Sequence, residues 1–214
     1  MALQALVFDA YGTLYDVHAV IRRCEEFWPG KGPALSQLWR AKQLEYTWQR
    51  SLMRQYAPFS RVTQEALEYS CMALQLSLDS SRVEALMQEY RKLEMYPEAA
   101  LALAKLNVKQ AILSNGSPDM LDPLVAHSGL KFDAVLSVDE VKVFKPAPEV
   151  YQLAVDRLGV SRESIGFVSS NCWDALGAKS FGFRVFWINR LKAPVDRLGF
   201  QPDAIVSSLD EVLL

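Results

Sequence analysis

The sequence predicts an α/β fold built on a parallel sheet, because short apolar segments alternate along the chain with helical patterns. Each apolar segment is followed by polar residues. Parallel strands bring the residues that follow them to one edge of the sheet, so that edge is where we expect the chemistry. The expected buried strands are residues 3–9, 108–113, 134–138, 165–168 and 185–188.

Helical patterns occupy the segments between the later strands, at residues 97–106, 117–127 and 146–158. Ser117 precedes Pro118, which is typical of an N-cap residue with proline in the first helical turn. These helices are expected to cover the two faces of the sheet.

A long helical insertion separates the first two strands. Residues 17–95 contain no strand-like run, and helical periodicity is clear in 35–52, 62–74 and 81–93. In the first of these, the residues expected to share an apolar face are Leu35, Leu38, Trp39, Leu44, Trp48 and Leu52. We therefore predict a helical cap subdomain at 17–95, inserted after the first strand of a core that comprises 1–16 and 96–214.

The composition indicates a well-cored globular protein, with 50% hydrophobic and 22% charged residues among 214. Lys plus Arg is 23 and Asp plus Glu is 25, a net charge of −2, which argues against nucleic-acid and membrane-surface binding. The three cysteines form no CxxC pair, so neither a disulfide framework nor a zinc knuckle is expected. Neither a signal peptide nor a membrane span is expected, and a cytoplasmic location is the simplest reading.

Four polar motifs follow the strands. Asp9 ends the first strand and begins the turn Asp9-Ala10-Tyr11-Gly12-Thr13, and the others are Ser114-Asn115-Gly116, Lys145-Pro146 and Ser169-Ser170-Asn171-Cys172-Trp173-Asp174. At one sheet edge these motifs would bring hydroxyls, amides, a lysine and a second carboxylate to Asp9. The two histidines are isolated, and no phosphate-binding glycine motif occurs, so neither a metal nor a cofactor is expected.

These motifs, in this order, resemble those of the haloacid dehalogenase superfamily over essentially the whole chain. The segments FDAYGTLYDV, LSNGSP, VFKP, SSNCWDA and LWRAKQLEYTW are similar to the narrower L-2-haloacid dehalogenase (type II) subgroup. The resemblance implies a Rossmann-like core with a cap subdomain and metal-independent hydrolysis of L-2-haloalkanoic acids to D-2-hydroxy acids and halide. It also implies a homodimer, although the apolar faces of the cap helices could equally be buried within one chain.

The resemblance further implies a role for each matching residue. Asp9 would attack the carbon that bears the halogen and form an ester, with Lys145 supporting it. Asp174 and Asn171 would orient or deprotonate the water that hydrolyses the ester. The remaining matches are Thr13, Ser114 and Ser169, expected to hold carboxyl oxygens, and Tyr151, expected to close the site.

Substrate recognition is expected from the cap and from the strand ends. Arg40 could clamp the substrate carboxylate or receive the halide, and sequence alone leaves both roles open. Asn115 would lie near the leaving halide. By resemblance, the residues that line the substrate pocket are Tyr11, Gln43, Leu44, Phe59 and Trp173.

Alternative hypotheses assign different roles to the same residues. A magnesium-dependent phosphatase of the same superfamily is the alternative enzyme, but it would need a second acid where Tyr11 stands and another acid beside Asp174. A non-catalytic binding protein is a further alternative. Tyr11, Phe59 and Trp173 could be ordinary core aromatics, and Asp174 could simply favour the start of a helix.

Overall fold

The computed structural model describes residues 2–212 and contains one parallel sheet in the order β3-β2-β1-β4-β5-β6. Its strands are β1 (Ala5–Phe8), β2 (Lys109–Ser114), β3 (Ala134–Ser137), β4 (Ile165–Ser169), β5 (Arg184–Ile188) and β6 (Ala204–Val206). The α/β class and the five predicted strands are confirmed. The edge strand β6 was not predicted, because three residues are too few to show a periodic pattern.

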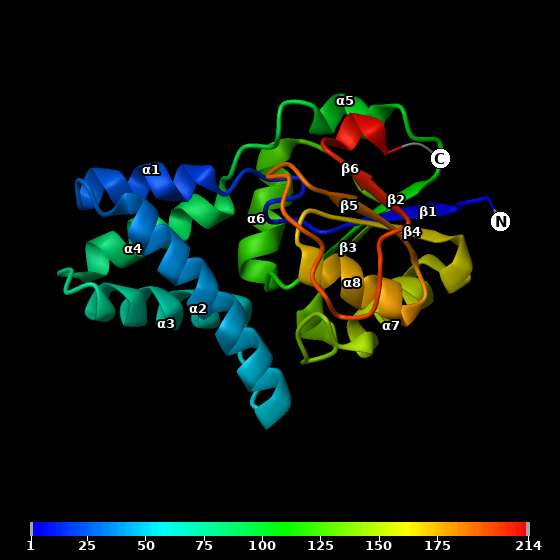
Figure 1. Cartoon of the computed structure of the whole chain (residues 1–214). Helices are drawn as coiled ribbons and strands as arrows, with labels where there is room; N and C mark the ends of the chain where they lie inside the picture. The colour runs from blue at the N-terminus through cyan, green and yellow to red at the C-terminus, as the bar shows by residue number, and fades with distance from the viewer. Residues whose placement is uncertain (1, 213–214) are drawn as a thin grey trace.

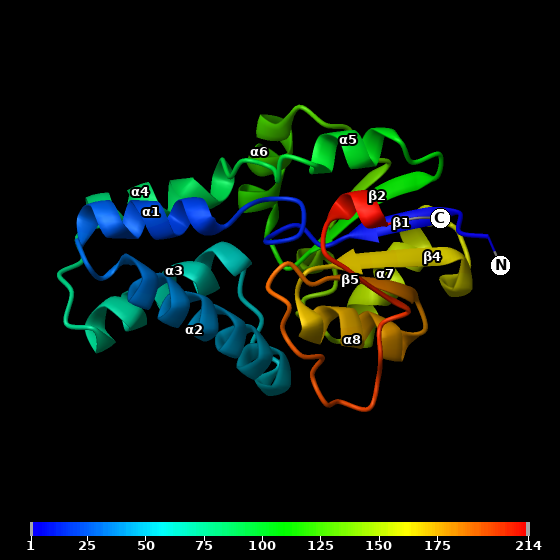
Figure 2. The same cartoon turned by 45° about the horizontal axis from the view of Figure 1, so that its top comes forward.

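Helices cover both faces of the sheet, with α5 and α6 on one side and α7 and α8 on the other (Figures 1 and 2). Their bounds are α5 (Ala99–Ala104), α6 (Pro118–Ser128), α7 (Pro148–Leu158) and α8 (Cys172–Phe181), with single 3-10 turns at η1 (Val138–Glu140), η2 (Arg162–Ser164) and η3 (Leu209–Glu211). Ser117 stands at the N-cap of α6 as predicted. Its hydroxyl makes no cap bond and donates instead to Asp119 Oδ1 at 2.6 Å.

Four helices pack together beyond the carboxyl ends of the strands (Figure 1). They are α1 (His18–Phe27), α2 (Gly32–Met53), α3 (Phe59–Ala73) and α4 (Ser80–Arg91). The Trp39 indole N–H donates to the Thr63 carbonyl at 2.7 Å and joins α2 to α3. Within residues 2–212, no helix is both long enough and apolar enough to cross a bilayer.

The buried face of α2 differs from the one that the apolar pattern predicts. Leu35 and Trp39 are buried, but Trp48 and Leu52 are exposed, and the buried face continues through Gln43 and Thr47. Both polar side chains are satisfied there, since Gln43 Nε2 donates to Thr63 Oγ1 at 2.7 Å and Thr47 Oγ1 donates to the Leu44 carbonyl at 2.6 Å. Hydrogen bonding lets polar groups occupy a buried stripe.

Strand β1 has a partner on each side, which places its carboxyl end at the middle of the sheet edge. Phe8 pairs with Ile112 of β2 and with Val168 of β4. The pairing extends one residue further, because the amide of Asp9 donates to the Val168 carbonyl at 2.9 Å. Asp9 therefore follows a fully buried strand and lies between the carboxyl ends of β2 and β4.

Candidate active site

The carboxylate of Asp9 is the centre of a buried polar cluster and is only 6% exposed. Lys145 Nζ donates to Oδ1 at 3.1 Å. Thr13 Oγ1 and Asn171 Nδ2 donate to Oδ2 at 3.0 and 2.8 Å. Three donors from three separate segments thus orient one carboxylate, as the sequence motifs predict.

A second carboxylate lies on the other side of Lys145. Lys145 Nζ donates to Asp174 Oδ2 at 2.9 Å, and both side chains are almost completely buried. Ser169 Oγ donates to the same oxygen at 3.1 Å, while the Tyr151 hydroxyl donates to Oδ1 at 2.9 Å. Asp174 is thus a hydrogen-bonded member of the cluster as well as a residue in the first turn of α8.

Burial and charge act against each other in this cluster. Burial acts to lower the pKa of Lys145, but the negative charges of Asp174 and Asp9 outweigh it and raise that pKa above its usual value. The pKa of Asp174 is raised to about 6, chiefly by burial and also by the charge of Asp9, while Lys145 and the Tyr151 hydrogen bond oppose the shift. Lys145 therefore remains an ammonium at neutral pH, and Asp174 ionises close to neutrality.

The second sequence motif supports Lys145 through its asparagine. Asn115 Oδ1 accepts a hydrogen bond from the Lys145 amide at 3.0 Å. Ser114 Oγ accepts a hydrogen bond from the Gly116 amide at 3.0 Å, so the turn that follows β2 sets its position. Its hydroxyl proton remains available to donate, and its role in holding a carboxyl oxygen stays a prediction.

Arg40 connects helix α2 to the cluster around Asp9. One guanidinium nitrogen donates to Gln43 Oε1 at 2.6 Å, and the other lies 3.4 Å from Asn171 Oδ1. Because the amide nitrogen of Asn171 contacts Asp9, a single side chain separates Arg40 from that carboxylate. Leu44 follows Gln43 on α2 and is half-buried. Both predicted roles of Arg40 are compatible with this geometry.

Aromatic side chains enclose the turn that follows Asp9. The rings of Tyr11 and Phe59 are both buried, with centroids 6.1 Å apart. A Cβ atom at Gly116 would lie 2.9 Å from the Tyr11 ring, so the close approach requires glycine there. Trp173 meets Trp48 of α2 edge-on at 5.6 Å. Tyr11 and Phe59 belong to the core and at the same time flank the Asp9 turn, whereas Trp173 is half-buried and Trp48 is exposed.

Ser170 and Arg190 hold that turn through contacts that the sequence motifs do not predict. The Ser170 amide donates to Thr13 Oγ1 at 2.9 Å, and Ser170 Oγ donates to the Gly12 carbonyl at 2.7 Å. Arg190 donates to the carbonyls of Gly12 and Thr13 at 3.2 and 3.3 Å. No sequence motif includes Arg190. Its place just after the fifth predicted strand is the sequence feature that could have indicated a role at this edge of the sheet.

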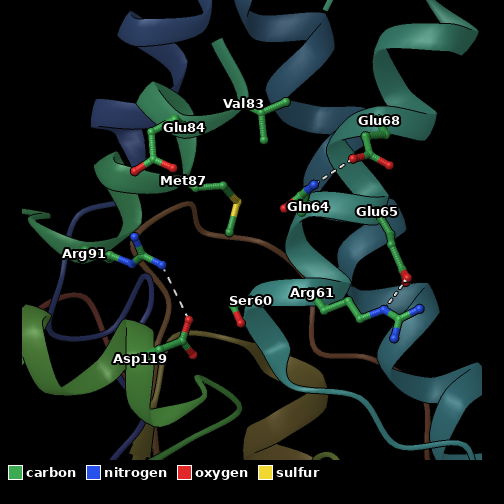
Figure 3. Close-up of a pocket in the computed structure, with 10 residues that line it drawn as sticks. All are labelled: Ser60, Arg61, Gln64, Glu65, Glu68, Val83, Glu84, Met87, Arg91 and Asp119. Atoms are coloured by element: carbon green, nitrogen blue, oxygen red, sulfur yellow. Dashed lines mark hydrogen bonds and ion pairs between the residues drawn. The ribbon is translucent and has the colours of Figure 1, made fainter. Parts of the chain in front are cut away.

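Two cavities of similar volume differ in their relation to the Asp9 cluster. One of about 430 Å³ lies between α3, α4 and α6, where Arg61 pairs with Glu65 and Arg91 with Asp119 (Figure 3). It contains no residue of the Asp9 cluster. The other, of about 440 Å³, reaches Asn171 and Trp173. Within residues 2–212, no three His, Cys, Asp or Glu side chains are grouped in a way that could hold a metal ion.

Comparisons with known proteins agree with this arrangement. The family model of the haloacid dehalogenase-like hydrolases matches residues 3–182. The chain is 47% identical to an (S)-2-haloacid dehalogenase of Pseudomonas sp. (strain YL), covering 99% of this chain and 93% of that protein. It is 46% identical to haloacetate dehalogenase H-2 of Moraxella sp. (strain B), covering 99% and 96%.

A solved structure shares both the fold and much of the sequence. L-2-haloacid dehalogenase from Xanthobacter autotrophicus, determined with chloropropionic acid covalently bound, superposes with a TM-score of 0.92 at 44% identity, covering 97% of this chain and 96% of that one. The family expected from the sequence motifs is therefore confirmed. This chain belongs to the haloacid dehalogenase-like hydrolase family, among the L-2-haloacid dehalogenases.

Proposed function

We propose that the protein hydrolyses L-2-haloalkanoic acids to D-2-hydroxy acids and halide through an ester on Asp9. The observation that carries the proposal is the Asp9 carboxylate, held by Lys145, Thr13 and Asn171 in a chain whose relatives are named for dehalogenation. Each turnover consumes one water and releases one halide and one proton.

In the first step an Asp9 oxygen attacks carbon 2 of the acid. A carbon–oxygen bond forms, the carbon–halogen bond breaks with its electron pair leaving on the halide, and the configuration inverts. Lys145, Thr13 and Asn171 fix the direction of the carboxylate and so reduce the entropy lost on reaching the reacting geometry. The aromatic side chains around Tyr11 limit the access of water to the nucleophile.

In the second step water attacks the carboxyl carbon of the Asp9 ester. Asp174 accepts the proton of that water directly or through its hydrogen-bonded neighbours. The bond between the Asp9 carbon and the substrate oxygen then breaks, the departing alkoxide takes a proton back from Asp174 to give the D-2-hydroxy acid, and the regenerated Asp9 carboxyl loses its proton to solvent. A base with a pKa of about 6 suits this task near neutral pH. Lys145 supports the developing negative charge on the Asp9 oxygen that it contacts.

The donor set at this edge does not suit a divalent cation. The ammonium of Lys145 bridges Asp9 and Asp174, the two carboxylates that would otherwise share a metal. The position two residues after Asp9 carries Tyr11, whose hydroxyl has no hydrogen-bond partner within residues 2–212. A phosphatase would also need an acid there to protonate its leaving group, so no observation favours that alternative.

The helices beyond the strand ends are part of the proposal. We propose residues 17–95 as a cap subdomain that supplies Arg40, Gln43, Leu44 and Phe59 to the substrate pocket. The contact of Arg40 with Asn171 supports this, because it links α2 to the Asp9 cluster. Relatives named for 2-haloacids and for haloacetate indicate short 2-halocarboxylates as the substrate class.

We also propose a homodimer and a cytoplasmic location. Helices α2 and α3 pack on each other and expose large apolar side chains, among them Leu52 at 85% and Met72 at 77%. Exposed apolar groups on neighbouring helices are typical of an association surface. The free thiols of Cys24, Cys71 and Cys172 fit a reducing compartment.

The reaction is tested by halide release from the separate enantiomers of 2-chloropropionate with EDTA present. We expect release from the L enantiomer alone, with D-lactate as the organic product. Asp9→Asn should lower kcat by more than about 10⁴-fold, as loss of a covalent nucleophile does, and Asp156→Asn on the exposed side of α7 is the control. Equal release from both enantiomers would contradict the stereochemical proposal.

Loss of the proposed base should trap the intermediate. In Asp174→Asn the ester should form and hydrolyse slowly, so mass spectrometry of the protein mixed with L-2-chloropropionate should find an adduct on the peptide that contains Asp9. Asp156→Asn should show no accumulated adduct. An inactive, folded Asp174→Asn protein without an adduct would place Asp174 before the first step.

The pH dependence of kcat follows from the raised pKa of Asp174. Because the base must be ionised, kcat should fall about tenfold per pH unit below about pH 6. Tyr151→Phe removes a hydrogen bond that lowers this pKa, so the acid limb should move to higher pH. If the acid limb of the kcat profile lies at the same pH in wild type and in Tyr151→Phe, the ionisation that causes it belongs to a group other than Asp174.

Protonation of Asp174 does not itself destabilise the folded protein at low pH. The pKa of Asp174 is raised in the folded state, so protonation of this group favours folding, and its contribution to stability is lost as the pH rises through about 6. Thermal unfolding measured at each pH of the profile separates the two effects.

The dimer is tested by light scattering on the eluting protein, with an expected mass of about twice 24.1 kDa. Leu52→Glu combined with Met72→Glu should halve the mass, because charge on a buried apolar surface opposes association. Leu101→Glu, on α5 and 68% exposed, should leave it unchanged. A wild-type monomer would refute the proposal.

A further inference from the structure

The guanidinium of Arg190 contacts the turn that carries Asp9 from the side of β5. Its two terminal nitrogens donate to the carbonyls of two consecutive residues, Gly12 at 3.2 Å and Thr13 at 3.3 Å. These partners lie more than 170 positions away in the sequence. A planar fork suits two neighbouring acceptors, whereas a lysine ammonium would reach them without a defined direction.

Arg190 is also fixed by an ion pair and by an aromatic contact. Nη2 also contacts Glu98 Oε1 at 2.8 Å, and the guanidinium stacks over the Tyr96 ring, 3.7 Å from its centroid. The side chain is 20% exposed. An arginine with an ionic partner, an aromatic support and two backbone acceptors has little freedom left, so it presents a rigid fork to the turn.

The turn cannot satisfy those two carbonyls by itself. Its own amides, those of Thr13, Leu14 and Tyr15, converge on the Ala10 carbonyl at 3.0 to 3.2 Å. Gly12 adopts a left-handed φ of 84°, which turns the chain sharply after the nucleophile. The Thr13 hydroxyl that donates to Asp9 is carried by this same turn. Ser170 holds one side of the turn, through the Gly12 carbonyl and the Thr13 hydroxyl, and Arg190 holds the Gly12 and Thr13 carbonyls from the loop after β5, so the position of this hydroxyl relative to Asp9 depends on both.

We infer that Arg190 is a positioning residue for the nucleophile: by binding the carbonyls of Gly12 and Thr13 it holds the Thr13 hydroxyl against Asp9. The inference rests on the proposed function, since the reaction is the one assigned to Asp9 above. Both terminal nitrogens of Arg190 face Gly12, Thr13 and Glu98, so we assign Arg190 to the turn and not to the substrate carboxylate. Arg40 is the guanidinium that adjoins the Asp9 cluster.

The test compares Arg190→Ala with Arg162→Ala. Arg162 makes similar contacts at the opposite edge of the sheet, donating to the Phe181 carbonyl at 3.2 Å and stacking on the Phe181 ring. We expect Arg190→Ala to lower kcat for L-2-chloropropionate on the order of 10- to 100-fold, as displacement of a reacting group does, with KM changed less than about threefold. Arg162→Ala should keep the wild-type kcat.

Chemical rescue separates positioning from general destabilisation. Arg190 lines the cavity of about 440 Å³ that also contains Tyr96 and Gly12, so a small cation can enter the space left by the side chain. Guanidinium, below denaturing concentrations, should restore part of kcat in Arg190→Ala, and methylammonium should restore less. Arg190→Lys should retain the charge but not the activity, because it lacks the fork.

Hydrogen exchange of the peptide that covers residues 10–15 gives a readout that needs no turnover. Exchange should be faster in Arg190→Ala than in wild type or in Arg162→Ala. If Arg190→Ala does not fold, Glu98→Gln is measured in its place. This change weakens the ion pair that holds Arg190, so it should also lower kcat and speed exchange of residues 10–15.

The outcomes are distinguishable. The inference would be overturned if folded Arg190→Ala keeps the wild-type kcat and shows unchanged hydrogen exchange. If Arg190→Ala does not fold, the same result in Glu98→Gln would overturn it. If wild-type protein releases no halide from any 2-haloacid, the proposed function fails. The exchange of residues 10–15 then decides whether Arg190 holds the turn, with faster exchange supporting that role and unchanged exchange refuting it.

Discussion

The interaction on which the site depends is the buried ammonium of Lys145 between the carboxylates of Asp9 and Asp174. Removing three charged groups from water is costly, and their attraction offsets that cost only if every remaining donor and acceptor is paired. Here the two carboxylates receive further hydrogen bonds from Thr13, Asn171, Ser169 and Tyr151. Loss of one partner would leave an uncompensated buried charge, so these residues operate as a unit.

The parallel sheet makes this cluster possible. β1 and β4 are neighbours in the sheet, which places Asp9 and the motif after β4 at adjacent strand ends. Lys145 and Asn115 come from loops elsewhere at the same edge and are joined by the hydrogen bond from the Lys145 amide. Backbone pairing of buried strands thus determines the position of side chains that could not hold one another in place in water.

The two carboxylates of the cluster differ in their burial and in their surroundings. Asp174 is fully buried, and its pKa is raised to about 6, while Asp9 retains slight exposure and lies beside the aromatic side chains of the pocket. A nucleophile needs access to substrate, and a base needs a pKa near the working pH. Their different environments fit the two roles proposed for them, and Arg190 extends the network to the backbone of the nucleophile turn.

The five main strands and the helices between the first two could be predicted from the sequence, because strand and helix periodicity are local signals, and the polar strand ends indicated which side chains gather around Asp9. The hydrogen-bond partners and the burial of individual side chains follow only from the tertiary structure. Ser114 binds its own turn, Trp48 and Leu52 face outward, and Arg190 reaches Gly12 across the chain. Such contacts depend on which loops meet in space and on hydrogen bonds that let polar groups occupy buried positions, and hydrophobic patterning does not record them.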